Sequence, residues 1–303
     1  MSTTGRTAAW GFGFAFVGVL VFSFSLPMTK VALAGFEPMT IAIGRAAIAG
    51  TLALLALRIA RVRWPGRRYL RPFLVTALGI VVGWPVLTTV ALQSTTSAHA
   101  AVIAAGLPIA TAVFAVLRAG EHPPRAFWWA SVLGTVAVVA FALSRGGASG
   151  GSLVADLLML GAVTLAALGY AEGAVLARDM PGWQVVSWTL VISLPLTVPV
   201  GMLAMAGSLR EQTPAPAAWG GLLYLAIGSM YLGFFAWYRG LSDLGVARGS
   251  QVQLLQPLLT LLWSVLLLGE TVGADTLLAA LLVIAAVVWV QRTRPASEPA
   301  VPE

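Results

Sequence analysis

The sequence predicts an all-α integral membrane protein with ten transmembrane helices, arranged as two inverted five-helix repeats. Three observations support this prediction. Of the 303 residues, 59% are hydrophobic and only 10% are charged, and the mean hydropathy is +0.90. So few charges could not cover the surface of a soluble protein of this size. The apolar residues also gather into membrane-length runs, and one fifteen-residue segment recurs 149 residues later.

The apolar runs give the expected helices, because a helix needs about 20 apolar residues to cross a hydrocarbon core of about 30 Å. Prolines Pro195 and Pro199 interrupt the seventh run, and the tenth run is short. The expected spans are Trp10 to Thr29, Pro38 to Leu57, Phe73 to Leu92, His99 to Leu117, Ala126 to Leu143, Leu153 to Val175, Trp183 to Met205, Ala217 to Tyr238, Gly249 to Leu268 and Gly273 to Val290.

The positive charges predict the orientation of these spans. If the arginine-rich loop between Arg58 and Arg71 is cytoplasmic, 14 of the 18 lysine and arginine residues lie on the cytoplasmic side. Three, Lys30, Arg145 and Arg210, lie outside, and Arg45 lies within the second span. This asymmetry follows the positive-inside rule, so we expect a multi-pass protein of the inner (cell) membrane with both termini in the cytoplasm.

The recurring segment divides the chain into two halves. Leu107 to Glu121 reads LPIATAVFAVLRAGE and Gln256 to Glu270 reads QPLLTLLWSVLLLGE, and the two share a Pro, a Thr and a final Gly-Glu in register. The copies fall on the fourth and ninth spans, so the repeated unit has five helices, and the second unit must enter the membrane upside down. A Gly/Ser-rich linker near residue 147 separates the expected domains, 1–146 and 147–303.

Inverted repeats around a site at the membrane midplane are a recurrent construction of secondary transporters. Two similar units with opposite orientations can exchange conformations and expose one site to each side in turn. The repeated segment is therefore expected to line and gate such a site. Pro108 and Pro257 are the expected gating or kink residues, since a proline inside a helix frees the carbonyl four residues earlier. The alternative is that they only shape a kinked helix.

Two five-helix halves, each with a proline-containing helix that ends in Gly-Glu (Gly120-Glu121 and Gly269-Glu270), resemble the EamA branch of the drug/metabolite transporter superfamily. The resemblance covers the whole chain in architecture and is specific mainly in these two segments. It implies the basket-like ten-helix fold of that superfamily and export of small metabolites. Exporters of amino acids are one subgroup of the family.

The ninth span carries the main candidate binding residues. Gln253, Gln256 and Thr260 recur at helical spacing on one face, and amides within hydrocarbon need polar partners. This face is expected to line a cavity, although contacts between helices are the alternative explanation. The equivalent positions on the fourth span are Ala104, Leu107 and Thr111, which are mostly apolar. Such a site would suit an amphipathic substrate.

Further candidates lie at the centres of other spans. Trp84 with Thr88 one turn later, Tyr170 and Tyr231 could form an aromatic cavity wall, although each could equally be a packing residue.

Charged residues within the spans are few. Arg45 lies seven residues into its span, about 10 Å deep, and should reach outward or pair with an acid. Asp156 is the expected partner by depth, either as a structural ion pair or as part of a carboxylate clamp for substrate. Glu172 could carry a coupling proton, bind a substrate amine, or only be solvated at the interface.

Several function classes are excluded or disfavoured. Without cysteine there are no disulfides or thiolate sites, and His99 and His122 are the only histidines, so neither a metal site nor an enzyme is expected, and no cofactor. The expected partners are a small-molecule substrate and membrane lipid, not nucleic acid, and nothing demands an oligomer. The leading hypothesis is an exporter of amino acids, aromatic or apolar ones included, or related metabolites. Alternatives are an exporter of hydrophobic drugs or other metabolites, and a membrane enzyme or scaffold whose repeat is purely architectural.

Overall fold

A computed structural model describes residues 3–119, 125–126, 128–129, 132–133, 136, 152–211, 213–244 and 252–293 of the chain. No strand occurs among these residues, and the all-α membrane class is confirmed for them. Six helical segments are long and apolar enough to cross a membrane: Trp10–Leu33, Pro38–Ile59, Arg67–Ala91, Leu153–Gly173, Gly182–Glu211 and Pro216–Gly240. Three shorter apolar helices cover Ser97–Thr111, Gln256–Leu268 and Ala274–Ala285.

The count of ten spans stays a prediction, because most of the fifth expected span, Ala126 to Leu143, lies outside the described residues. The seventh span is not interrupted as its prolines suggested. A single helix, α10, runs from Gly182 to Glu211 through both Pro195 and Pro199.

The described helices of the first half follow the chain in order. Proline at the first position starts α3, where its missing N–H costs nothing. The elements are α1 (Thr3–Ser23), α2 (Ser25–Leu33), α3 (Pro38–Ile59), the short 3-10 helix η1 (Arg67–Tyr69), α4 (Leu70–Thr76), the π-helix η2 (Ala77–Gly83), α5 (Trp84–Ala91), α6 (Ser97–Ala104) and α7 (Leu107–Ala119).

The second half is built in the same way. Proline again starts a helix, here α11. The elements are α9 (Leu153–Leu176), α10 (Gly182–Glu211), α11 (Pro216–Leu223), the π-helix η3 (Tyr224–Leu232), α12 (Gly233–Leu244), the 3-10 helix η4 (Gln253–Leu255), α14 (Gln256–Leu268) and α15 (Ala274–Thr293).

Irregular helix geometry recurs at the 149-residue spacing of the sequence repeat. The bounds of α7 and α14 are equivalent at this spacing, and the turn at Ala105–Gly106 is equivalent to the last two residues of η4. The π-helix η2 likewise corresponds to most of η3. Pro108 and Pro257 therefore occupy the second position of a new helix that follows a break, where proline is tolerated. The kink expected at each proline is thus a break in the helix just before it.

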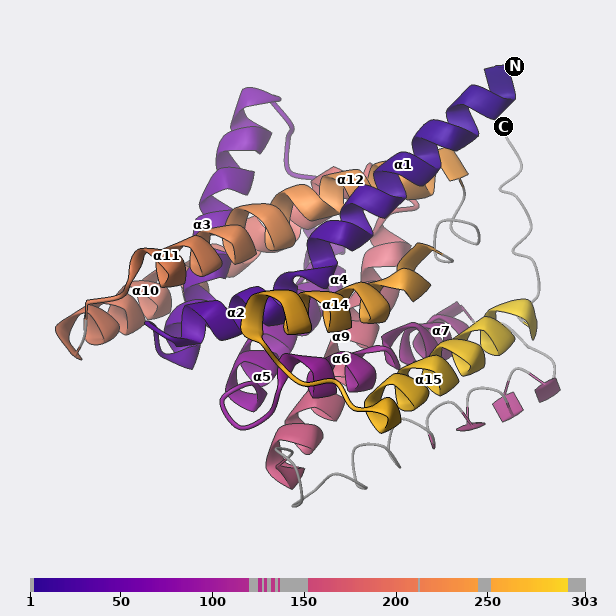
Figure 1. Cartoon of the computed structure of the whole chain (residues 1–303). Coiled ribbons are helices and arrows are strands. Elements are labelled where there is room, and N and C mark those ends of the chain that lie inside the picture. The colour runs from indigo at the N-terminus through magenta and orange to yellow at the C-terminus, as the bar shows by residue number, and fades with distance from the viewer. Residues whose placement is uncertain are drawn as a thin grey trace.

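The helices pack in pairs that join the two halves (Figure 1). The helix α1 runs along α12, and the counterpart pair is α9 with η2 and α5. The second helix of one half, α3, packs along the second of the other, α10, and α6 contacts α14. If each span is replaced by its counterpart in the other half, the first pairing becomes the second. The pairing of the second and seventh spans and that of the fourth and ninth spans are unchanged. This is the pattern expected of two related units around a twofold axis.

Small residues let the paired helices approach closely, as is common where helices associate in membranes. A Cβ atom added to Gly79 on η2 would lie 2.8 Å from the Cα of Gly169 on α9, and it would also collide with the carbonyl oxygen of Leu165. At the equivalent interface, a Cβ on Gly18 would lie 2.9 Å from the backbone of Trp237. Glycine is therefore required at both interfaces by the distance between backbones.

We expect Gly79→Ala to lower the free energy of unfolding by about 1 to 3 kcal/mol, because the added methyl group overfills the contact with α9. Thermal unfolding in detergent measures this effect. Gly220→Ala on α11 is the matched control, because an added Cβ there meets no atom within 4 Å and alanine favours a helix. Equal stability of the two variants would contradict the inferred close contact.

Candidate functional site

A cavity lies between the two halves of the described structure. Its volume is about 90 Å³. Every described α-helix except α4 and α11 contributes to its lining. The second, seventh and tenth spans contribute Arg45, Thr189 and Ile284. The walls therefore belong to both halves.

Equivalent positions of the two halves meet in this lining. Ile80 and Val81 of η2 correspond at the 149-residue spacing to Ser229 and Met230 of η3, and all four line the cavity. Ala104 and Leu107 of the first half correspond in the same way to Gln253 and Gln256 of the second, and these four also line it. In all four pairs the residue of the first half is apolar. In three of them the equivalent residue of the second half is polar, namely Ser229, Gln253 and Gln256.

The structure brings seven of the expected residues together. The candidate residues that line the cavity are Gln253, Gln256, Pro257, Thr260, Trp84, Tyr170 and Arg45. Pro108 has no described side chain, although its neighbour Leu107 lines the cavity. Sequence reasoning missed Phe22 and Phe234, whose rings lie 4.9 Å apart in the lining. Their signal is weak, because phenylalanine is common throughout this apolar sequence.

Two expected residues lie outside the cavity. The Thr88 hydroxyl is buried and donates to the carbonyl oxygen of Trp84 at 2.6 Å, so it is used within its own helix. The Tyr231 hydroxyl lies 3.2 Å from that of Ser187, and its ring packs edge-on against Phe235. Thr88 lies one turn after Trp84, so the sequence predicts that both face the cavity. A threonine hydroxyl in a helix can instead donate to the carbonyl oxygen four residues earlier, as Thr88 does here.

Polar groups of Ser23, at the break between α1 and α2, find hydrogen-bond partners on α14. The Thr260 hydroxyl can donate to the carbonyl oxygen of Ser23 at 2.9 Å, and the indole N–H of Trp263 donates to the Ser23 hydroxyl at 2.9 Å. The ring of Trp263 also stacks on Phe24 with centroids 4.2 Å apart. Thr260 is therefore committed to structure as well as exposed to the cavity.

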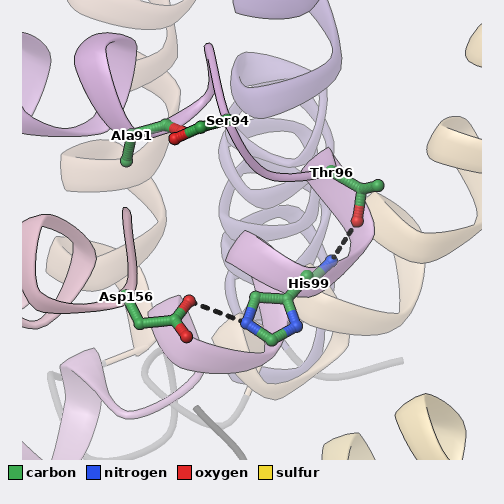
Figure 2. A network of polar contacts seen from close by, with 5 residues as sticks. All are labelled: Ala91, Ser94, Thr96, His99 and Asp156. Carbon is green, nitrogen blue, oxygen red and sulfur yellow. Dashed lines mark hydrogen bonds and ion pairs between the residues drawn. The ribbon is translucent and has the colours of Figure 1, made fainter. Parts of the chain in front are cut away.

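The expected pairing of Arg45 with Asp156 is wrong. Asp156 is buried, and its Oδ1 lies 2.8 Å from Nε2 of His99 in the first turn of α6 (Figure 2). The amide N–H of His99 also donates to the hydroxyl of Thr96, the N-cap of α6. Depth along the membrane normal suggested the wrong partner, because the sequence gives depth but not which helix lies beside α9.

Glu270 joins the end of α14 to the start of α6. Gly269 has a positive φ of 63° and ends α14 in the left-handed conformation that favours glycine. The carboxylate that follows accepts bonds from the amides of Ser97 and Ala98, both at 2.9 Å, and from the Ser97 hydroxyl at 3.0 Å. A negative charge at a helix N-terminus is favourable. The backbone amides that Glu270 binds belong to the other half, so its carboxylate forms a contact between the halves.

The remaining candidate charge is Glu172, which is buried on α9, has an interaction of its own and is not among the cavity-lining residues. The symmetry counterpart of Glu270, Glu121, lies outside the described residues, as do His122 and Gln251. Among the described residues, no cluster of three His, Cys, Asp or Glu side chains could hold a metal ion.

Membrane-length apolar helices around a cavity that both halves line are the arrangement of a membrane transporter. The EamA-like transporter family matches the chain twice, over residues 9–143 and 153–292, and the chain belongs to this family. Membership in the drug/metabolite transporter superfamily follows.

Relatives agree with this assignment. The chain is 47% identical over 258 residues to the uncharacterized transporter YdeK of Bacillus subtilis, covering 85% of this chain and 88% of that one. It is 42% identical over 53 residues, 18% of this chain and 31% of the relative, to an uncharacterized transporter of Haemophilus influenzae. A solved structure described only as a crystal structure of a protein shares the fold, with a TM-score of 0.62 at 17% identity over 92% of this chain and 97% of that one.

We expect His99→Leu and Asp156→Leu each to lower the free energy of unfolding by about 3 to 5 kcal/mol, because each breaks the buried hydrogen-bonded pair between these two side chains. The double variant should lose less than the sum of the single variants. Unfolding in detergent measures this double-mutant cycle. Asp156→Asn is the conservative control, since an amide keeps an oxygen toward His99. Additive losses in the cycle would mean that the two side chains do not interact.

We expect Glu270→Ala to lower the unfolding temperature, because the first turn of α6 loses its three acceptor contacts. Glu270→Gln should lose less, since it keeps one oxygen acceptor. Thermal unfolding in detergent compares both variants with Glu211→Ala, which removes an exposed carboxylate at the end of α10. If the Glu270 and Glu211 variants are equally stable, the carboxylate does not hold α6.

Proposed function

We propose that the protein exports amino acids, aromatic or other apolar ones included, or related small amphipathic metabolites across the inner membrane. The observation that carries this proposal is the composition of the cavity lining. The second half contributes the amides of Gln253 and Gln256, whereas the equivalent positions of the first half contribute Ala104 and Leu107. A solute with a polar backbone and an apolar side chain complements such a lining.

Aromatic residues extend the apolar part of this proposed site. Trp84, Tyr170, Phe22 and Phe234 line the cavity together with aliphatic side chains. Aromatic rings bury large areas and pack against other rings in offset or edge-on geometry. This supports the choice of amino acids with apolar side chains as the first substrates to test.

We propose alternating access of two inverted halves as the mechanism. Each half has a break before its repeated helix, at Ala105–Gly106 and at η4, and the π-helices η2 and η3 lie at equivalent positions. Broken and irregular helices at a midplane site, related by a repeat, accompany this mechanism in other transporters. Positive charges favour two cytoplasmic termini.

Three alternatives differ in how well the cavity lining supports them. Hydrophobic drugs or other metabolites would also suit a cavity with many apolar residues. Phosphorylated metabolites fit less well, because a phosphate calls for several cationic groups and Arg45 is the one charged side chain among the lining residues that the structure describes. An enzyme or a scaffold with an architectural repeat is the alternative of another class, and an absence of flux for all solutes would favour it.

The test uses purified protein in liposomes preloaded with individual radiolabelled amino acids. We expect efflux of a subset of them, and we expect Gln253→Leu with Gln256→Leu to reduce that efflux at least tenfold with unchanged thermal stability, because the amides supply the polar contacts. Gln93→Leu, on an exposed residue outside the cavity, is the matched control.

The outcomes separate the hypotheses. Efflux that survives the double change would keep the transporter but move its polar site away from α14. Absence of efflux for every amino acid would contradict the amino-acid proposal. The same liposomes loaded with hydrophobic cations or other metabolites would then test the alternatives within the superfamily.

A further inference from the structure

Arg45 is a buried cation for which the described residues supply no salt bridge. It lies on α3 with 4% of its surface exposed, and it lines the cavity. Its Nε has no hydrogen-bond partner, and the ion pair expected for it is taken by His99. An arginine within a membrane span is costly to bury, so its retention in the cavity needs a reason.

No salt bridge joins Arg45 to an acid in the described part of the chain. No aspartate or glutamate is among the residues that line the cavity. The buried carboxylate of Asp156 is bound to His99, and that of Glu270 is bound to the start of α6. The side chain does not reach the surface either, because so little of it is exposed. A membrane arginine is usually paired with an acid or extends to the membrane surface. Among the described residues, Arg45 does neither.

A second lining residue has an unused polar atom. The Oε1 atom of Gln256 is buried and has no hydrogen-bond partner. An amide oxygen accepts hydrogen bonds, whereas the guanidinium group of Arg45 only donates them. The cavity therefore holds a vacant donor group that carries a positive charge and a vacant neutral acceptor. Together they match a solute with a carboxylate and a separate donor such as an ammonium group.

We propose that Arg45 binds the carboxylate of the transported solute and so restricts the transporter to carboxylate-bearing substrates. This inference rests on the proposed function and names the group that the site recognises. A guanidinium pairs with a carboxylate through two parallel hydrogen bonds, and the pair is strong where water is excluded. A single arginine matches one carboxylate, whereas a phosphate would need further cations. Solutes that are only cationic are rejected, because no lining carboxylate meets them.

The test compares each of the twenty proteinogenic amino acids with its α-amide, which lacks the carboxylate. Thermal stabilisation of the purified protein in detergent reports binding, and efflux of the radiolabelled amino acids from liposomes reports transport. We expect some amino acids to stabilise the native protein and their amides to do so at least tenfold more weakly. Arg45→Gln should weaken binding and efflux of the same amino acids by about 10- to 100-fold.

Two further variants make the test specific. Arg58→Gln removes a positive charge from an exposed position on the same helix, and it should leave both readouts unchanged. Arg45→Lys keeps the charge but loses the bidentate geometry, so it should bind with intermediate strength. Without solute, Arg45→Gln should unfold no earlier than the native protein, since it removes an uncompensated buried charge. If Arg45→Gln does not fold, the Arg45→Lys variant carries the comparison.

Amides that stabilise the native protein as well as the acids, or an Arg45 variant with native selectivity, would overturn the inference. So would the absence of stabilisation by every amino acid. The proposed function fails in a different way. Binding that depends on Arg45 without efflux would uphold the carboxylate site and contradict export. Efflux that is insensitive to Arg45 would uphold export and contradict the site.

Discussion

The constraint on which the structure depends is that polar backbone groups inside a membrane need partners within the protein. A continuous helix meets this requirement by itself, but a broken helix does not. This chain breaks its helices at Phe24, at Ala105–Gly106 and before Gln256. At the break at Phe24 the partner comes from the other half, because the Thr260 hydroxyl can donate to the carbonyl oxygen of Ser23. Side-chain contacts of this kind join the two halves.

The helix α14 provides much of this compensation. Thr260 reaches the carbonyl of Ser23, and Glu270 receives the first amides of α6, so one helix of the second half completes two helices of the first. A change in the position of α14 would have to release or exchange these contacts. In the proposed alternating-access mechanism, such a change would accompany the opening of the transport path. Close glycine contacts such as that of Gly79 with Gly169 have a different role. They set the distance between two helices and supply no hydrogen-bond partners.

The cavity follows from the same arrangement. The π-helices and the broken helices of both halves supply lining residues at equivalent positions. Because the two sequences have diverged, equivalent positions carry different chemistry, with amides on one side and an apolar wall on the other. Arg45 adds a cation that no described acid neutralises. A symmetric framework thus contains an asymmetric site, as recognition of an amphipathic solute requires.

The sequence by itself determined the membrane class, the approximate position of nearly every described span, the repeated segment and the polar face with Gln253 and Gln256. These features depend on hydropathy and on helical periodicity, which are local properties. The tertiary structure alone decided that Asp156 pairs with His99, that Glu270 caps α6, and that Thr88 and Tyr231 lie outside the cavity. Hydropathy fixes the depth of a residue along the membrane normal, but the neighbours of a helix and its rotation about its own axis depend on packing between segments far apart in the sequence.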